Sequence, residues 1–207
     1  MVTLKNPKVK SFIQVVKDKC IEHNIELQLV NRKKIKIFPK IYVGGYFEDT
    51  SRKSGVLACA LDSKEYLNIL VHEFSHVEQW IENTPVWKDS VYVYDVDQWL
   101  NGKEVRNIED KIDKVKYMEL DCEKRSVKNI IKYDLPLDIS TYIKKANSYI
   151  FFYEYLKQTR RWCKPNNAPF NNKNKNLWKL CSGKIENKSY YKEIPPRILK
   201  KFIENEI

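Results

Sequence analysis

The stretch Leu67–Trp80, LNILVHEFSHVEQW, decides how the fold of this 207-residue chain is interpreted. Its apolar residues recur every three or four positions, which predicts an amphipathic helix. The predicted core face consists of Leu67, Leu70, Val71, Phe74 and Val77. Asp62 and Glu65 are spaced as a capping box that would begin this helix. His72 and His76 project from a face adjacent to the apolar one.

The spacing of His72 and His76 predicts a metal site, because residues four apart lie one above the other on a helix. Two imidazoles placed in this way can bind one metal ion. Glu73, directly after the first histidine, points into the same cleft and can act as a base. This is the HExxH pattern, which predicts zinc bound by the two histidines and Glu73 as the catalytic general base. The alternative is a chance match on a surface helix. With only three histidines in the chain, such a match is rare.

A catalytic zinc site needs a third protein ligand. The remaining histidine, His23, ends the first predicted helix, where a surface or capping role is expected. A helix predicted from about Ile108 to Tyr133 offers a carboxylate instead, because Glu119 falls inside its buried stripe. That stripe consists of Val115, Met118, Cys122, Ser126 and Ile130. A buried carboxylate is costly unless it is paired or metal-bound, so Glu119 is the predicted third ligand.

Glu123 lies one turn after Glu119 and shares its face. It is predicted to accept the remaining N–H of a metal-bound histidine, and it is the alternative third ligand. A solvated charged face is the other interpretation of this pair. The small side chains of Cys122 and Ser126 predict that the glutamate helix packs close to the histidine helix.

The remaining patterns predict an α+β fold. Residues 7–23 read as a helix, and strands are predicted at residues 25–30, 34–38, 41–49 and 54–61, the first two joined as a hairpin by NRKK. The predicted architecture is a compact domain with an N-terminal helix, a small mostly antiparallel sheet, the histidine helix and the glutamate helix. A further helix at about 140–162 and a short one at 196–207 follow. We expect a domain over residues 1–163 and a basic, partly low-complexity tail over 164–207.

Composition excludes several classes of protein. The five cysteines are odd in number and widely spaced, which argues against a disulfide framework and a zinc ribbon. No apolar run is long enough to span a bilayer, and the charged N-terminal segment resembles neither a secretory signal nor an anchor. We therefore expect no membrane association and a cytosolic location.

Charge is concentrated in the last quarter of the chain. Residues 157–207 contain 13 Lys and Arg against 4 Glu, a net charge of +9, whereas the whole chain carries +11. The same segment holds several aromatic residues, and cations with aromatics are the residues that hold phosphates and unpaired bases. A nucleic-acid partner is one interpretation of this tail. The other is a solubilising tail whose aromatic residues pack back on the body.

The motif HEFSH and the order of the predicted elements resemble the gluzincin branch of the zincin metallopeptidases. The similarity is greatest to compact minigluzincins, which include the ImmA/IrrE-like proteins. Glu119, Cys122, Glu123 and Ser126 stand where gluzincins have the ligand glutamate, a small residue, Asp or Asn, and another small residue. Glu123 departs from that pattern. The segment from residue 144 to 162 also resembles uncharacterised metallopeptidase-like proteins of tailed phages.

The resemblance implies a peptide substrate. In gluzincins an edge strand before the active helix binds peptide by strand addition, and GVLACAL at residues 55–61 would play that part. A further residue stabilises the oxyanion, and Tyr149, Tyr153 and Arg160 are candidates. We therefore expect a zinc metallopeptidase, in the host cytoplasm if a phage encodes it. The alternatives are a zincin-fold regulatory or nucleic-acid-binding protein with little hydrolysis, and a structural chain with a chance motif.

Overall fold

The computed structural model describes residues 5–38, 41–51, 53–164 and 166–207, and it confirms the predicted α+β class. The chain forms two compact units, one of residues 1–84 with 125–137 and the other of residues 85–124 with 138–207. The long helix α4 (Ile108–Lys132) contributes its first part to the second unit and its last turns to the first. None of the helices in the described ranges is long and apolar enough to cross a membrane.

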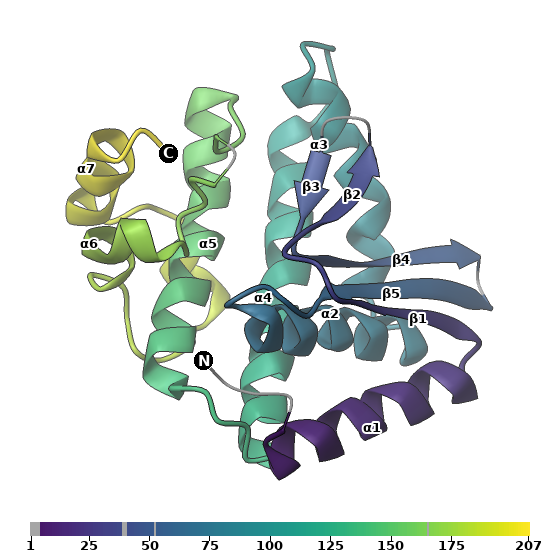
Figure 1. Ribbon diagram of the computed structural model, residues 1–207. Coiled ribbons are helices and arrows are strands. Elements are labelled where there is room, and N and C mark those ends of the chain that lie inside the picture. The colour runs from purple at the N-terminus through teal and green to yellow at the C-terminus, as the bar shows by residue number, and fades with distance from the viewer. Residues whose placement is uncertain (1–4, 39–40, 52, 165) are drawn as a thin grey trace. The chain divides into compact units, whose positions relative to one another are not determined.

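The first unit holds the sheet and the histidine helix (Figure 1). Its elements are α1 (Pro7–Glu22), β1 (Ile25–Val30), β2 (Ile35–Phe38), β3 (Ile41–Val43), β4 (Gly45–Ser51), β5 (Ser54–Ala60) and α2 (Tyr66–Ile81). The predicted helices at 7–23 and around Leu67–Trp80 are thus confirmed. The third predicted strand is divided into β3 and β4 at its glycine pair.

The strands pair differently from the prediction. The main sheet has the order β1–β5–β4, with β1 parallel and β4 antiparallel to β5, and β2 pairs only with β3. The hairpin predicted between residues 25–30 and 34–38 is therefore wrong. GVLACAL belongs to the central strand β5, so its prediction as an edge strand is also wrong. Residues 57–60 are fully buried, as suits a central strand, whereas β4 ends in exposed polar residues that suit an edge.

Helix α2 packs against β4 and β5 through its apolar stripe, and the core between α1 and α2 includes Phe12 and Phe74, whose ring centroids lie 5.7 Å apart. The helix begins later than predicted. Its N-cap is Glu65, which makes no side-chain capping bond, so the capping box predicted at Asp62 and Glu65 is wrong. Residues 61–65 instead form a turn in which Ser63 Oγ accepts the Glu65 backbone N–H at 3.3 Å.

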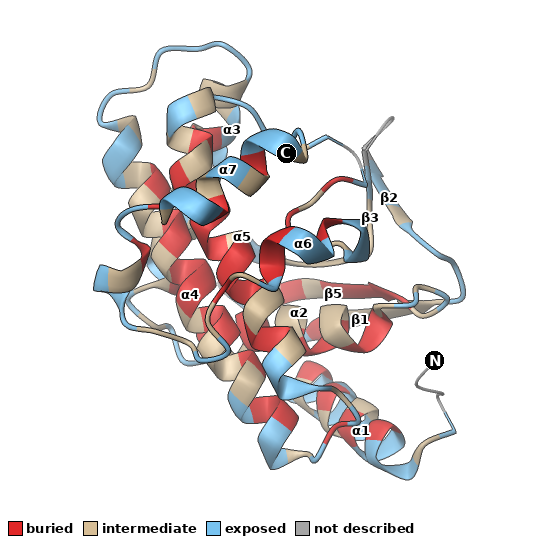
Figure 2. Cartoon of the chain, turned by 90° about the vertical axis from the view of Figure 1, so that its left-hand side faces the viewer, coloured by how far each residue is buried: buried red, intermediate tan, exposed pale blue. Residues whose placement is uncertain are grey.

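The second unit is helical. It contains η1 (Trp87–Val91), α3 (Tyr92–Leu100), the first part of α4, α5 (Ile139–Thr159), η2 (Asn172–Asn174), α6 (Lys175–Trp178), η3 (Lys188–Tyr191) and α7 (Pro196–Glu204). Asp138 caps α5 by accepting the Thr141 backbone N–H at 2.7 Å. Figure 2 shows how densely buried residues follow α5. The predicted helices at 108–133, 140–162 and 196–207 are confirmed within a few residues.

The C-terminal segment packs on α5. The rings of Tyr155 and Phe202 stack at 5.0 Å, and Tyr191 donates its hydroxyl to Asn147 Oδ1 at 2.6 Å. Trp178, Tyr191 and Phe202 are all buried. The tail aromatics therefore anchor the segment to the helix, as one interpretation of the tail predicted. The division of the chain at residue 163 stays a prediction.

Candidate metal centre

Helix α2 places His72 and His76 next to each other. Their ring centroids lie 4.9 Å apart and their planes are nearly perpendicular, at 88°. His76 is buried and His72 is half-buried. The burial of the apolar stripe of α2 against the sheet fixes the rotation of the helix, so the neighbouring face carries both imidazoles in one direction. The predicted pair is brought together.

Gln79 orients the second histidine. His76 Nδ1 lies 2.8 Å from Gln79 Oε1, and an amide oxygen only accepts hydrogen bonds. A neutral ring that donates from Nδ1 to this oxygen has Nε2 as its potential metal-binding nitrogen. Such an N–H bond normally fixes the tautomer and orientation of a metal-binding histidine. Gln79 was not predicted, although its position three residues after His76 on one helix face is a signal for such a contact.

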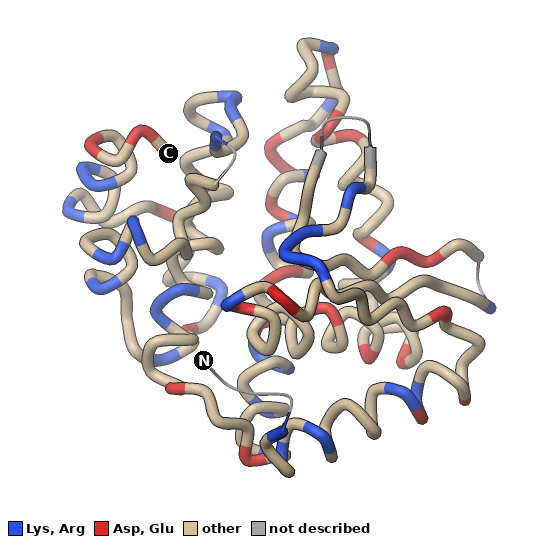
Figure 3. Tube along the Cα trace, viewed as in Figure 1, with Lys and Arg blue, Asp and Glu red and all other residues tan. Residues whose placement is uncertain are grey.

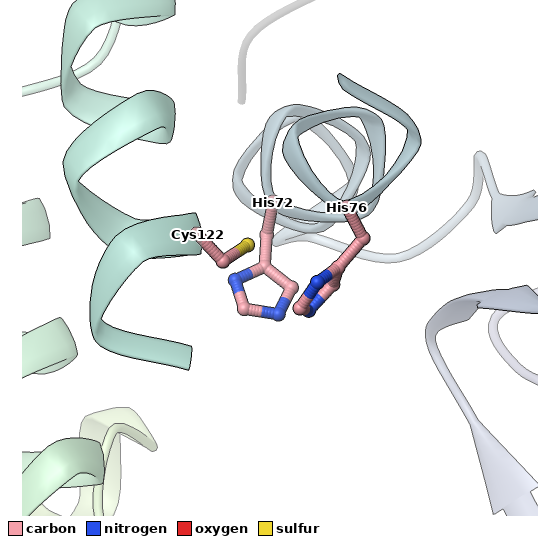
Figure 4. A group of neighbouring side chains, drawn as sticks. All are labelled: His72, His76 and Cys122. Carbon is pink, nitrogen blue, oxygen red and sulfur yellow. The ribbon is translucent and has the colours of Figure 1, made fainter. Parts of the chain in front are cut away.

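Cys122 is the third potential donor. One ligand atom from each of His72, His76 and Cys122 lies within 4.8 Å of the other two. Figure 4 shows the three side chains next to one another, two from α2 and one from α4. The thiol is fully buried. One turn later on the unbroken helix α4, Ser126 Oγ donates to Ser75 Oγ of α2 at 3.0 Å. This bond confirms the close approach that the small side chains predicted.

The donor set could hold a metal ion that prefers nitrogen and sulfur ligands. Zinc binds imidazole nitrogen at about 2.0–2.1 Å and thiolate sulfur at about 2.3 Å, which in a tetrahedron separates the donors by about 3.3–3.6 Å. The three donor atoms lie within 4.8 Å of one another. Two imidazoles and a thiolate are also softer ligands than magnesium or calcium prefer. Cys122 was not predicted as a donor, because its place in the buried stripe of α4 indicates only a small residue for close packing.

Glu73 lies against strand β4. A Cβ atom added to Gly45 would be 3.4 Å from Glu73 Cγ, so the side chain begins directly beside the backbone of this strand. Burial, with a smaller effect of the Glu73 charge, raises the pKa of the Cys59 thiol of β5 to about 12. The carboxylate is therefore close to both strands, and Cys59 stays a protonated thiol.

The two predicted glutamates of α4 are both buried. Glu123 Oε2 accepts a hydrogen bond from the Tyr142 hydroxyl at 2.7 Å. The pKa of the Tyr149 and Tyr153 phenols is raised well above the usual range, first by burial and then by nearby negative charge that includes Glu119. Glu119 therefore lies near both phenols. Glu119 is not a member of the group of donors within 4.8 Å. Its role as a ligand, and that of Glu123 as a partner of a histidine, stay predictions.

The three candidates for oxyanion stabilisation, Tyr149, Tyr153 and Arg160, lie on α5 or at its C-terminal end. Tyr149 and Tyr153 lie with their hydroxyl oxygens 3.1 Å apart on α5. Arg160 ends α5 in the left-handed conformation and donates to the carbonyl oxygens of Trp99 and Lys103, both at 2.8 Å, so it serves to hold the chain after α3.

His23 forms the C-cap of α1, as predicted, and its Nε2 lies 3.5 Å from Glu22 Oε1.

Comparison of the chain with known protein families, with curated proteins and with solved structures finds no match. The paired histidines and Cys122 could hold a metal ion, and this geometry is consistent with a zincin-like site.

Proposed function

We propose that this protein is a zinc-dependent metallopeptidase. The observation that supports the proposal best is the HExxH segment on α2, with its imidazoles 4.9 Å apart and a third donor close by. His72 and His76 hold the ion, and α4 provides the third ligand. The bound ion supplies Lewis acidity, which polarises a carbonyl group and makes water acidic near neutral pH.

Glu73 is the general base in this proposal. Its carboxylate takes a proton from the attacking water and returns it to the leaving amine, which is how one residue serves both halves of peptide hydrolysis. Its position beside Gly45 suits this role, because β4 is an edge strand of the main sheet, as is β1 on the other side. A peptide in extended conformation that pairs with β4 would run past Glu73. We therefore assign substrate binding to β4.

Replacement of Glu73 by glutamine tests the catalytic role. The wild type is expected to cleave labelled casein or a mixed peptide library, and E73Q is expected to lose at least about 100-fold in rate, as is usual for a general base. Zinc content should stay near that of the wild type. E22Q, which changes an exposed glutamate at the end of α1, is the matched control and should cleave normally. Equal activity of E73Q and E22Q, or a zinc-loaded wild type that cleaves neither substrate, would overturn the proposal.

The third ligand is tested separately. Zinc per chain is measured in wild type, C122S and E119Q after purification without added metal, and each protein is then loaded with Co²⁺. If the thiolate binds the ion, Co²⁺ gives a strong sulfur-to-metal absorption in the near ultraviolet that C122S lacks. If Glu119 is the ligand, E119Q loses the metal, and the sulfur band is absent from wild type.

A further inference from the structure

The C-terminal segment holds more exposed cations than carboxylates among its described residues. Exposed Lys173, Lys175, Lys179, Lys184 and Arg197 form no ion pair among the described residues. Of the four glutamates in this segment, Glu204 pairs with Lys200 and Lys201 and Glu206 pairs with Lys164, whereas Glu186 and Glu193 form no ion pair among the described residues. We call the first five residues the basic face. Its charge is therefore available to a partner.

The basic face is built on packed helices. Helices α6 and α7 are in contact, and the side-chain amides of Asn176 and Asn205 bond to each other at 2.9 and 3.2 Å. Asn167 adds bonds at 3.0 Å to the carbonyl oxygens of residues 205 and 206. Figure 3 marks the positions of the Lys and Arg residues along this segment. Their spacing is thus fixed by the fold, in contrast to the cations of an unfolded tail.

We propose that the basic face binds the phosphate backbone of double-stranded nucleic acid. Clustered lysine and arginine neutralise phosphates, and this attraction needs no base contact. Single strands are bound mainly by stacking on freely exposed aromatic rings. In this segment Trp178, Tyr191 and Phe202 are buried. Trp162 and Phe170 are partly exposed, but their rings pack edge-on against Phe152 and Tyr149. The partner is therefore a duplex, bound without strong sequence preference.

An anionic membrane is the other partner that a basic helix can recognise, but α7 is poorly suited to it. A helix that lies in a membrane surface buries its apolar face among the lipids. Ile198 and Phe202 form that face of α7, and both are fully buried in the protein. The phosphates of a duplex require only the exposed cations, so the geometry favours nucleic acid over lipid.

Fluorescence anisotropy of a labelled 20-base-pair DNA with the full chain tests the proposal. If about four cations contact phosphates, the logarithm of the binding constant falls with that of the salt concentration with a slope of about −3.6. Affinity then drops roughly 100-fold between 50 and 200 mM salt. The variant K175Q/K179Q should reduce the steepness of this slope by about 2 and weaken binding at 50 mM at least about tenfold.

The matched control is K10Q/K17Q, which removes two exposed lysines from α1 and changes the net charge equally. It should bind DNA as the wild type does. Equal weakening by both double variants would show an effect of net charge alone and overturn the proposal. Binding to phosphatidylserine vesicles without binding to DNA would overturn it as well. So would a preference for single-stranded over double-stranded DNA, if K175Q/K179Q binds the single strand as the wild type does. None of these outcomes depends on peptidase activity.

Discussion

Replacing Gly45 by alanine should destabilise the protein by about 1–2 kcal/mol, because β4 approaches α2 too closely for a side chain. The added Cβ would lie 2.7 Å from Ala58 O of the neighbouring strand and 2.5 Å from Ile69 Cγ2 of α2. The carbonyl is backbone and cannot rotate away, so the strands must separate. Overpacking of this kind costs about 1–3 kcal/mol, and the reduced freedom of the unfolded chain returns about 0.4–1 kcal/mol.

Gly44 provides the matched control for this prediction. An added Cβ there would meet Ile69 Cδ1 at 2.4 Å, and the next atom, Ile69 Cγ1, at 3.5 Å. The terminal methyl group of an isoleucine can rotate aside, so G44A should change the free energy of unfolding by less than about 0.5 kcal/mol. The two variants add the same atom to neighbouring residues, and only the surroundings of that atom differ.

Thermal unfolding followed by circular dichroism measures the difference. For a chain of this length a loss of 1 kcal/mol lowers the melting temperature by about 2–4 °C, so G45A should melt roughly 2–8 °C below wild type and G44A within about 2 °C of it. G45A should also cleave peptides more slowly, because Glu73 Cγ lies 3.4 Å from the new atom. Equal melting temperatures for the two variants would refute the inferred close contact between β4 and β5.

Three further outcomes follow from the same structure. Gln79→Leu should weaken zinc binding about 10–100-fold in a competition with a chelator, because His76 loses the group that fixes its tautomer. Lys116→Met should cost about 3–5 kcal/mol in urea unfolding, because this fully buried cation pairs with both Glu154 and Asp113. Burial alone would raise the pKa of Asp113, but hydrogen bonds and charges from the flanking lysines outweigh this effect and lower it. The stabilisation is thus present above the unfolded pKa of about 3.9 and lost below it, so the stability difference between wild type and Asp113→Asn should shrink as the pH falls below about 4.

The helices could be predicted from the sequence because each one carries its own apolar period. The predicted positions of α1, α2, α4 and α5 agree with the structure within a few residues, apart from the missed start of α2 at Tyr66. Strand pairing could not be predicted in the same way. The alternation in residues 25–30 predicts a strand but contains no information about its partner, and β1 pairs in parallel with β5 rather than with the next strand. A parallel partner requires a long connection, which local patterns do not reveal.

The metal centre shows the same difference between what one helix determines and what depends on contact between two elements. The histidine pair follows from the spacing within one helix, so the sequence was sufficient to predict it. The third donor comes from another helix, and its identity depends on how closely the two helices pack. That distance is set by Ser75 and Ser126, whose hydroxyl oxygens lie 3.0 Å apart. Gln79 was not predicted, because a glutamine three residues after a histidine on a helix is common and often has another role.

Glu119 and Cys122 lie at different distances along α4 from the contact between Ser75 and Ser126. They are three positions apart on α4 and share a face, so helical periodicity cannot choose between them. Both would bring one negative charge to the ion, so net charge does not choose either. With a rise of 1.5 Å per residue, however, Cys122 is about 6 Å along the helix from Ser126, and Glu119 is about 10 Å from it. A short thiol reaches an ion only near the point where the helices meet. We therefore expect the cobalt spectrum to show a thiolate ligand, with Glu119 held beside Tyr149 and Tyr153.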